Sequence, residues 1–339
     1  MNIKATLPDI ARTLVTKGKG ILAADQSPRT MDKQLSAIGV TPDAEARRQY
    51  RELLFTTDGI EQYVTGIILH DGTIRNHTSN NEAFVDVLLA KGIIPIIKVD
   101  KSTIPHTNFP NEVVTQGLDG LAERFEEYYN MGARAAKWRS VFFITDTLPS
   151  EQNIVLDAMF LARYASLAQA AGIVPIVEPE VIFSGTHSLE RAEEVTTAVL
   201  QKVFEVLQWY KVDLEGLILK SSMVLAGSEH SVQTPPEQVA EATIRTFTNS
   251  VPSAVPGIVF LSGGQTPERA TTNLNAIAQR EQSRDDLPWE FTFSFSRGLE
   301  LPVQEVWKGN PDNVSDAQAA LIAQLVKNTE ADQGRYQAE

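Results

Sequence analysis

The 339-residue sequence contains no cysteine, only five histidines and no apolar run long enough to cross a membrane. The absence of cysteine excludes disulfide bonds, thiolate nucleophiles and cysteine-ligated metal sites. The histidines are scattered and form neither an HxxxH nor an HxH pair, so we expect no bound metal. The first ten residues, MNIKATLPDI, lack the apolar core of a signal peptide. These absences predict a soluble cytoplasmic protein without a membrane partner.

Positive charge is also scarce, since 30 lysines and arginines stand against 43 aspartates and glutamates, for a net charge of −13. Affinity for a nucleic-acid backbone needs clustered cations, so we expect no nucleic-acid partner. An acidic chain can still bind small anions where a few cations converge in one cleft. With 42% hydrophobic residues, the chain can also bury a large core.

Short apolar, β-branched runs recur along the whole chain. Their hydrophobicity is nearly continuous rather than alternating, which is typical of buried parallel strands. The runs are GILAAD (20–25), YVTGIILH (63–70), IIPIIKVD (93–100), ARAAKWR (133–139), GIVPIVEPE (172–180), LEGLILK (214–220), GIVFLSGG (257–264) and FTFSFSR (291–297).

Helix-length amphipathic segments separate these runs. One covers 153–172 and is stopped by Gly172, and another covers 188–210 with Ser188 as its N-cap. Eight strands alternating with helices predict a single (β/α)8 TIM barrel over residues 1–339. An open doubly wound sheet is the alternative, but no glycine fingerprint follows the first run. We expect the polar residues 328–339 to be loosely ordered.

Polar side chains gather where these runs end, and in a barrel those ends form the active-site face. Each charge could instead have a structural partner, but seven of the eight runs end this way, and chance would rarely produce that. The run that ends in His70 is the exception. The side chains at or near the other ends are Asp25, Lys98, Lys137, Arg139, Glu178, Glu180, Lys220, Ser262 and Arg297.

Such a cluster suits a lysine nucleophile. A desolvated lysine beside other cations favours its neutral amine, and Lys220 fits that description, with Lys98 or Lys137 as alternatives. Carbanion chemistry without a metal needs an organic electron sink, which a lysine Schiff base provides. These residues therefore predict a lysine-dependent enzyme acting on a carbonyl compound.

A phosphate site is indicated near the end of the chain. LSGGQTPERA (261–270) reads as a glycine loop that opens a helix, and backbone N–H groups of such a loop bind phosphate. Loops after the seventh and eighth barrel strands often form this site, and Arg297 ends the eighth run.

Ten stretches give the chain a resemblance to class I fructose-bisphosphate aldolases from about residue 10 to residue 336. In the family's order, they are GKGILAAD, RRQYRELLFT, IKVDK, TQGLDGLAER, AKWR, LARYAS, GIVPIVEPE, LEGLILK, FLSGGQ and LNAI. The resemblance implies a metal-independent, cofactor-free homotetramer that cleaves fructose 1,6-bisphosphate. A relative that prefers sedoheptulose 1,7-bisphosphate is a close alternative. A non-catalytic scaffold on the same fold would be expected to lack the catalytic residues, which are present here.

The resemblance also implies roles for particular residues. Lys220 would form the Schiff base, Glu178 would shuttle protons for that step, and Asp25 would help to take the proton of the C4 hydroxyl. Lys137 and Glu180 would hold the surrounding charge network, with Lys137 aiding proton transfer. The remaining substrate contacts would be Ser262, Gly263, Ser296 and Arg297 around the 1-phosphate, and Ser27, Lys98 and Arg139 towards the 6-phosphate.

Some positions depart from the family pattern. Gln26 stands where the family usually has glutamate, Ser221-Ser222 where it has Pro-Asn, and Ser296 where it has glycine. Many relatives also carry a C-terminal tail that ends in a tyrosine reaching the active site. Tyr336 aligns with the start of that tail. We expect carbanion protonation by water or Glu178 instead, and the alternative is that Tyr336 folds back.

Overall fold

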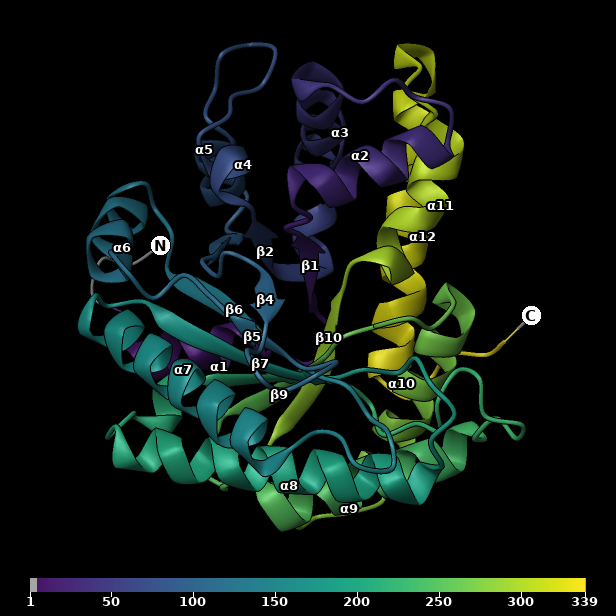
Figure 1. Cartoon of the computed structure of the whole chain (residues 1–339). Coiled ribbons are helices and arrows are strands. Elements are labelled where there is room, and N and C mark those ends of the chain that lie inside the picture. The colour runs from purple at the N-terminus through teal and green to yellow at the C-terminus, as the bar shows by residue number, and fades with distance from the viewer. Residues whose placement is uncertain (1–4, 339) are drawn as a thin grey trace.

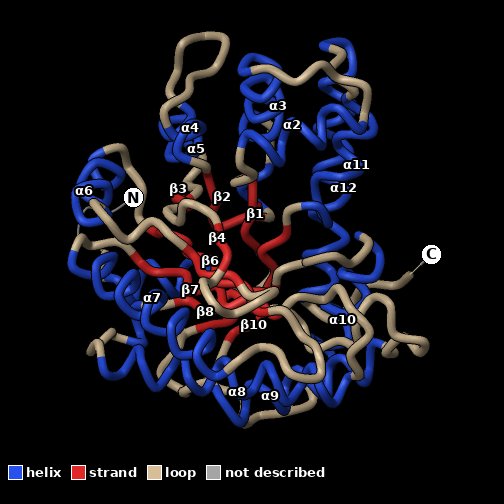
Figure 2. The backbone as a smooth tube through the Cα atoms, in the orientation of Figure 1, coloured by secondary structure: helices blue, strands red, loops and turns tan. Residues whose placement is uncertain are grey.

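The computed structural model of the protein describes residues 5–338, and its central feature is a closed parallel barrel. The order around the barrel is β1-β10-β9-β8-β7-β6-β3-β2. Figure 2 shows these strands at the centre of the molecule with helices around them. The barrel strands are β1 (Gly20–Ala24), β2 (Val64–Leu69), β3 (Ile94–Lys98), β6 (Ala135–Phe142), β7 (Val174–Val181), β8 (Ile218–Ser221), β9 (Gly257–Phe260) and β10 (Glu290–Phe295).

Helices form the outer layer of the molecule (Figure 1). Their inward faces and the outward faces of the strands bury one large apolar cluster. The helices are α1 (Leu7–Leu14), α2 (Pro28–Ala37), α3 (Ala44–Thr56), α4 (Asp71–Ile74), α5 (Phe84–Ala90), α6 (Leu121–Asn130), α7 (Glu151–Ala170), α8 (Leu189–Trp209), α9 (Pro236–Ser250), α10 (Pro267–Gln282), α11 (Arg297–Trp307) and α12 (Val314–Asp332). No helix within residues 5–338 combines the length and apolar character needed to span a membrane.

A second, smaller apolar cluster fills the barrel interior. Inward-facing strand residues such as Ile68, Ile96 and Ile176 meet the buried face of α1, which contributes Ile10 and Leu14. Helix α1 therefore closes the end of the barrel where the strands begin. The opposite end, where the strands finish, is left to the polar side chains.

The predicted (β/α)8 barrel is confirmed, since each of the eight apolar runs overlaps one barrel strand. The predicted limits differ mainly at two places. The run 214–220 opens with a short 3-10 helix, Leu214–Gly216, so its strand starts only at Ile218. Strand β6 continues beyond Arg139 to Phe142, because it keeps pairing with β7 up to Val181.

The two helices predicted from periodicity are also confirmed. Helix α7 ends at Ala170, and Gly172 follows with a left-handed φ of 74°. Helix α8 starts after Ser188, whose side chain accepts a hydrogen bond from the backbone N–H of Arg191 at 3.2 Å. Both boundaries follow the local chemistry of a helix end.

Two features differ from the expectations. The short antiparallel pair β4 (Thr103–Pro105) and β5 (Val113–Thr115) was not predicted, because three-residue strands leave almost no pattern. The expectation that 328–339 is loosely ordered is wrong for its first residues, which belong to α12. Asn328 and Asp332 are fully buried there, so polar residues at these positions mark a packed helix.

Candidate active site

A polar cleft of about 630 Å³ opens where the barrel strands finish. All twelve residues predicted for the site line this one cleft. They are Asp25, Ser27, Lys98, Lys137, Arg139, Glu178, Glu180, Lys220, Ser262, Gly263, Ser296 and Arg297.

Strand alternation explains why charged residues two apart enter the same cleft. Lys137 and Arg139 lie on β6, and Glu178 and Glu180 lie on β7, so each pair faces one side of its strand. Arg139 is paired in register with Glu178 across the two strands. The sequence motifs AKWR and VEPE therefore place two cations and two carboxylates beside one another.

Three buried ion contacts form the centre of the cleft. The Nζ atom of Lys137 lies 2.7 Å from Asp25 Oδ2 and 2.9 Å from Glu178 Oε2. The other oxygen of Glu178, Oε1, lies 3.2 Å from Lys220 Nζ. None of these four residues is more than 9% exposed. Two lysines and two carboxylates thus balance their charges away from bulk water.

The pKa values of the two lysines nevertheless shift in opposite directions. Burial lowers the pKa of Lys220, and the charge of Lys137 lowers it further, against the opposing effects of Glu178 and Asp25. Burial also disfavours the charged form of Lys137, but Asp25 and Glu178 on either side outweigh it and raise its pKa. The geometry therefore makes Lys220 the better nucleophile and keeps Lys137 as a fixed cation.

The two carboxylates remain ionised in this environment. Burial alone would raise the pKa of Asp25 and of Glu178, but the charges of Lys137 and Lys220 are stronger and lower both. Each carboxylate can therefore accept a proton from a neighbouring group at neutral pH.

One end of the cleft has the features of a phosphate site. The loop after β9 carries Ser262 and Gly263, and a Cβ added at Gly263 would lie 3.0 Å from Glu180 Oε1 and 2.6 Å from Leu261 Cδ1. Glycine is therefore needed for the backbone to pass this close to the cleft. Arg297 is exposed at the first turn of α11 and makes no ion pair within residues 5–338, so its guanidinium is available to an anion.

The remaining predicted residues line the same cleft from β3, β6 and the loop after β1. Lys98 Nζ lies 2.6 Å from Asp100 Oδ1, and the guanidinium of Arg139 donates to Glu180. The Oγ atom of Ser27 accepts the backbone N–H of Thr30 at 3.3 Å and caps α2. Lys98 and Arg139 therefore add two cations to the lining of the cleft, besides Arg297.

Sequence reasoning missed the residues behind this lining. Gln26 reaches the cleft and contacts the buried pair Arg51 and Glu300, which belong to α3 and α11. Asp100, the partner of Lys98, was also missed. Arg51 lies inside RRQYRELLF, a helical segment in which a charged residue would ordinarily face solvent. No sequence signal therefore distinguished the buried Arg51 from its neighbours.

Two other residues raised by the sequence lie away from the cleft. The side chain of His70 caps α4 by accepting the N–H of Gly72 at 3.3 Å. This capping role explains why the apolar run that ends in His70 adds no side chain to the cleft. Tyr336 is not among the residues lining the cleft, and its backbone N–H donates to Asn275 Oδ1 at 3.0 Å. The alternative in which Tyr336 folds back into the site is thus absent from the described structure.

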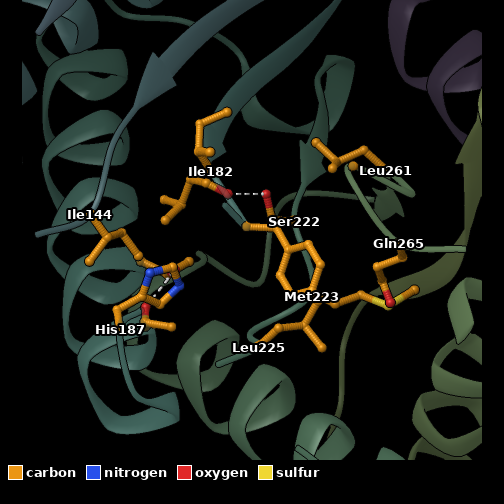
Figure 3. A pocket seen from close by; sticks show the side chains of 13 residues that line it. Ile144, Ile182, His187, Ser222, Met223, Leu225, Leu261 and Gln265 are labelled. Carbon is orange, nitrogen blue, oxygen red and sulfur yellow. Dashed lines mark hydrogen bonds between the residues drawn. The ribbon is translucent and has the colours of Figure 1, made fainter. Parts of the chain in front are cut away.

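The Ser221-Ser222 departure also points away from the cleft. Ser222 lines a separate enclosed void beside His187 and Met223, and its Oγ donates to the carbonyl of Val181 at 2.8 Å (Figure 3). The void, about 10 Å³, is at most of the size of one water molecule. Ser222 therefore links the segment after β8 to β7, and neither serine is among the residues that line the cleft.

Within residues 5–338, no group of three or more His, Asp or Glu side chains is arranged to hold a metal ion. The chemistry to be explained is that of the lysines and carboxylates.

Comparison with known proteins agrees with the cleft. A family profile described as "Fructose-bisphosphate aldolase class-I" matches residues 6–339. Fructose-bisphosphate aldolase 4, cytosolic, from Arabidopsis thaliana is 45% identical over 96% of this chain and 82% of its own length. The probable fructose-bisphosphate aldolase class 1 of Xanthomonas axonopodis pv. citri is 44% identical over 97% and 98%.

A solved structure leads to the same family. The fructose-bisphosphate aldolase from Plasmodium falciparum, determined in complex with TRAP and a small-molecule inhibitor, has a TM-score of 0.96 and 43% sequence identity. The match covers 98% of this chain and 95% of that one. With a barrel, a lysine–carboxylate cleft and relatives matched over nearly their full length, this chain belongs to the class I fructose-bisphosphate aldolase family.

Proposed function

We propose that this chain cleaves and re-forms fructose 1,6-bisphosphate through a Schiff base on Lys220. The observation that carries the proposal is the contact between Lys220 and Glu178, 3.2 Å apart in a buried site where the pKa of Lys220 is lowered. Lys220 combines burial with a lowered pKa, whereas the pKa of the equally buried Lys137 is raised.

Schiff-base formation needs protons to move at the Lys220 nitrogen and at the carbonyl oxygen of the substrate. The Glu178 carboxylate first takes a proton from the Lys220 ammonium, which leaves a neutral amine. The amine attacks C2 of the sugar ketone, and as the N–C bond forms, a proton passes from the nitrogen to the carbonyl oxygen, which becomes a hydroxyl. Glu178 then returns its proton to that hydroxyl, which leaves as water and gives a protonated imine.

Cleavage follows from the position of Asp25. Its carboxylate, held 2.7 Å from Lys137 Nζ, takes the proton of the C4 hydroxyl. The bond between C3 and C4 breaks, its electron pair moves to the imine nitrogen, and glyceraldehyde 3-phosphate leaves. Water protonates the resulting enamine at C3, and Asp25 releases its proton to solvent. Hydrolysis of the imine then releases dihydroxyacetone phosphate and the free Lys220 amine. The reaction is balanced without any metal or redox partner.

The two phosphates would take the cations that line the cleft. We assign the 1-phosphate to Arg297 and the loop at Ser262-Gly263, where a charge-assisted hydrogen bond can form. Lys98 and Arg139 would receive the 6-phosphate side of the sugar. Lys98 is held for this role by Asp100.

We further propose that residues 1–339 act as one catalytic domain, in the cytoplasm, as a homotetramer. Family resemblance supports the tetramer, and the name of the cytosolic Arabidopsis relative supports the location. Sedimentation at micromolar concentration tests the assembly, with the mass of four chains expected and that of a single chain contradicting it.

The test of the reaction is a cleavage assay on fructose 1,6-bisphosphate with Lys220→Met. The variant should lose all measurable cleavage, because the amines of Lys98 and Lys137 are engaged by carboxylates. Lys202→Met is the matched control, since Lys202 pairs with Glu205 on the outer helix α8. Activity in Lys220→Met above that of a protein-free blank would refute the proposal.

A further inference from the structure

A closed polar network lies directly behind the phosphate end of the cleft. The Nε2 atom of Gln26 donates to Ser296 Oγ at 2.7 Å and to Glu300 Oε1 at 2.7 Å. Its carbonyl oxygen accepts from Arg51, which also lies 3.4 Å from Glu300 Oε2. Arg51 and Glu300 are 3% and 1% exposed, so the network is buried everywhere except at Gln26 and Ser296.

The side-chain chemistry at position 26 is fixed by this network. One cation, Arg51, faces one carboxylate, Glu300, and the amide supplies both hydrogens and the one acceptor that its neighbours need. A glutamate at position 26 would remove both donors and set a second carboxylate beside Glu300 with one arginine between them. Such an arrangement is unfavourable in a buried site.

The same network bridges two loops that carry functional groups. Gln26 lies between Asp25, which we assign to proton transfer, and Ser27, which caps α2. Ser296 immediately precedes Arg297, which we assign to the 1-phosphate. Gln26 and Ser296 both depart from the family pattern, and in this chain their side chains contact each other.

We propose that Gln26 is a positioning residue that fixes the distance between Asp25 and Arg297, and so sets the fit of the bisphosphate. It acts through Glu300 and Arg51, which do not line the cleft. The inference rests on the proposed function, because it takes Arg297 as a phosphate ligand. If the proposal is right, the amide of position 26 and the carboxylate of position 300 can be exchanged without loss of the fit of the bisphosphate.

The experiment compares Gln26→Glu with the double variant Gln26→Glu/Glu300→Gln. The single variant should raise KM for fructose 1,6-bisphosphate roughly tenfold, because a buried polar pair is left mismatched. The double variant should return KM to within about threefold of the unmodified enzyme, since one carboxylate, one amide and Arg51 are again present, and the Ser296 hydroxyl can donate as well as accept. Gln49→Glu, an exposed change on the same helix as Arg51, is the control for added charge.

Each other outcome overturns the proposal. An unchanged KM in Gln26→Glu, with or without a lower melting temperature, would mean that the network only stabilises the fold. A raised KM that the double variant does not restore would mean that position 26 does not act through Glu300. If Gln26→Glu fails to fold, Arg51→Lys, which keeps the charge but loses the guanidinium fork, must raise KM severalfold.

A separate readout distinguishes failure of the proposed function. Borohydride trapping of dihydroxyacetone phosphate on Lys220 should succeed in the unmodified enzyme and in all of these variants, because the network does not touch Lys220. Absence of the adduct in the unmodified enzyme would refute the Schiff-base mechanism, whereas a retained adduct with unchanged KM would refute only the role of Gln26.

Discussion

Replacing Lys137 by methionine should be the most informative change in the charge network. The stem of the side chain stays similar in size, but the charge that joins Asp25 and Glu178 disappears. Both contacts are short, 2.7 and 2.9 Å, and Lys137 is only 4% exposed. Removing one partner from a buried ion network costs about 3–5 kcal/mol, because the other charges lose their compensation.

This loss of folding free energy can be converted into a decrease in melting temperature. The entropy of unfolding is about 2.1 cal/mol/K per residue, which for 339 residues gives roughly 0.7 kcal/mol/K. Lys137→Met should therefore melt about 4–7 °C lower at pH 8. Lys202→Met breaks a partly exposed ion pair with Glu205 and should change stability by less than about 1 kcal/mol. Differential scanning calorimetry measures both.

The loss should also depend on pH in a defined direction. In the unmodified enzyme, the pKa values of Asp25 and Glu178 are lowered, so their stabilisation is present above the unfolded pKa values and is lost as pH falls. Without Lys137, burial dominates, and the carboxylate pKa values rise. The variant should therefore gain stability from pH 8 towards pH 5, and its melting temperature should approach that of the unmodified enzyme.

Catalysis should change in a linked way. Because the charge of Lys137 lowers the pKa of Lys220, its removal should raise that pKa and move the acidic limb of the pH–rate profile upward by about one unit. Calorimetric scans usually resolve about 1 °C. A variant that melts within about 1 °C of the unmodified enzyme and keeps its pH–rate profile would therefore refute this account of the charge network.

Three further predictions concern single groups. Asp25→Asn should reduce cleavage by about 10²–10⁴-fold while an adduct still forms on Lys220, and a normal cleavage rate would refute the role of Asp25. Arg297→Ala should weaken bisphosphate binding by roughly 10–100-fold but leave binding of a non-phosphorylated ketose unchanged, and equal weakening of both would exclude a phosphate role. Asp332→Asn should stabilise the fold at pH 8, by at most about 4 kcal/mol, because burial raises the pKa of Asp332 to about 7 and one carboxylate oxygen has no partner within residues 5–338. The unfolded state loses its proton near pH 4, so the advantage should grow from pH 4 to pH 7, and a pH-independent difference in urea unfolding would contradict it.

Much of the barrel could be predicted from the sequence, because buried parallel strands must be apolar along most of their length. Seven of the eight runs also ended where the solvent-facing cleft begins, so the polar residues at those ends identified the lining. The helix limits at Ser188 and Gly172 followed from local capping chemistry, which needs no tertiary information.

The remaining features depend on contacts between distant segments. Composition could not separate Lys220 from Lys137, because their pKa values diverge only once both lie beside Glu178 in the closed barrel. The network of Gln26, Arg51 and Glu300 joins three elements that are remote in sequence. The strands β4 and β5 are too short to carry a periodic signal, so their pairing appears only in the fold.

The central claim is that Lys220 carries the covalent intermediate, and trapping tests it directly. The enzyme is incubated with dihydroxyacetone phosphate, reduced with borohydride, digested and mapped by mass spectrometry. The account predicts a single stoichiometric adduct on the peptide that contains Lys220, and none in Lys220→Met. An adduct on Lys98 or Lys137, or no adduct in an enzyme that still cleaves fructose 1,6-bisphosphate, would contradict it.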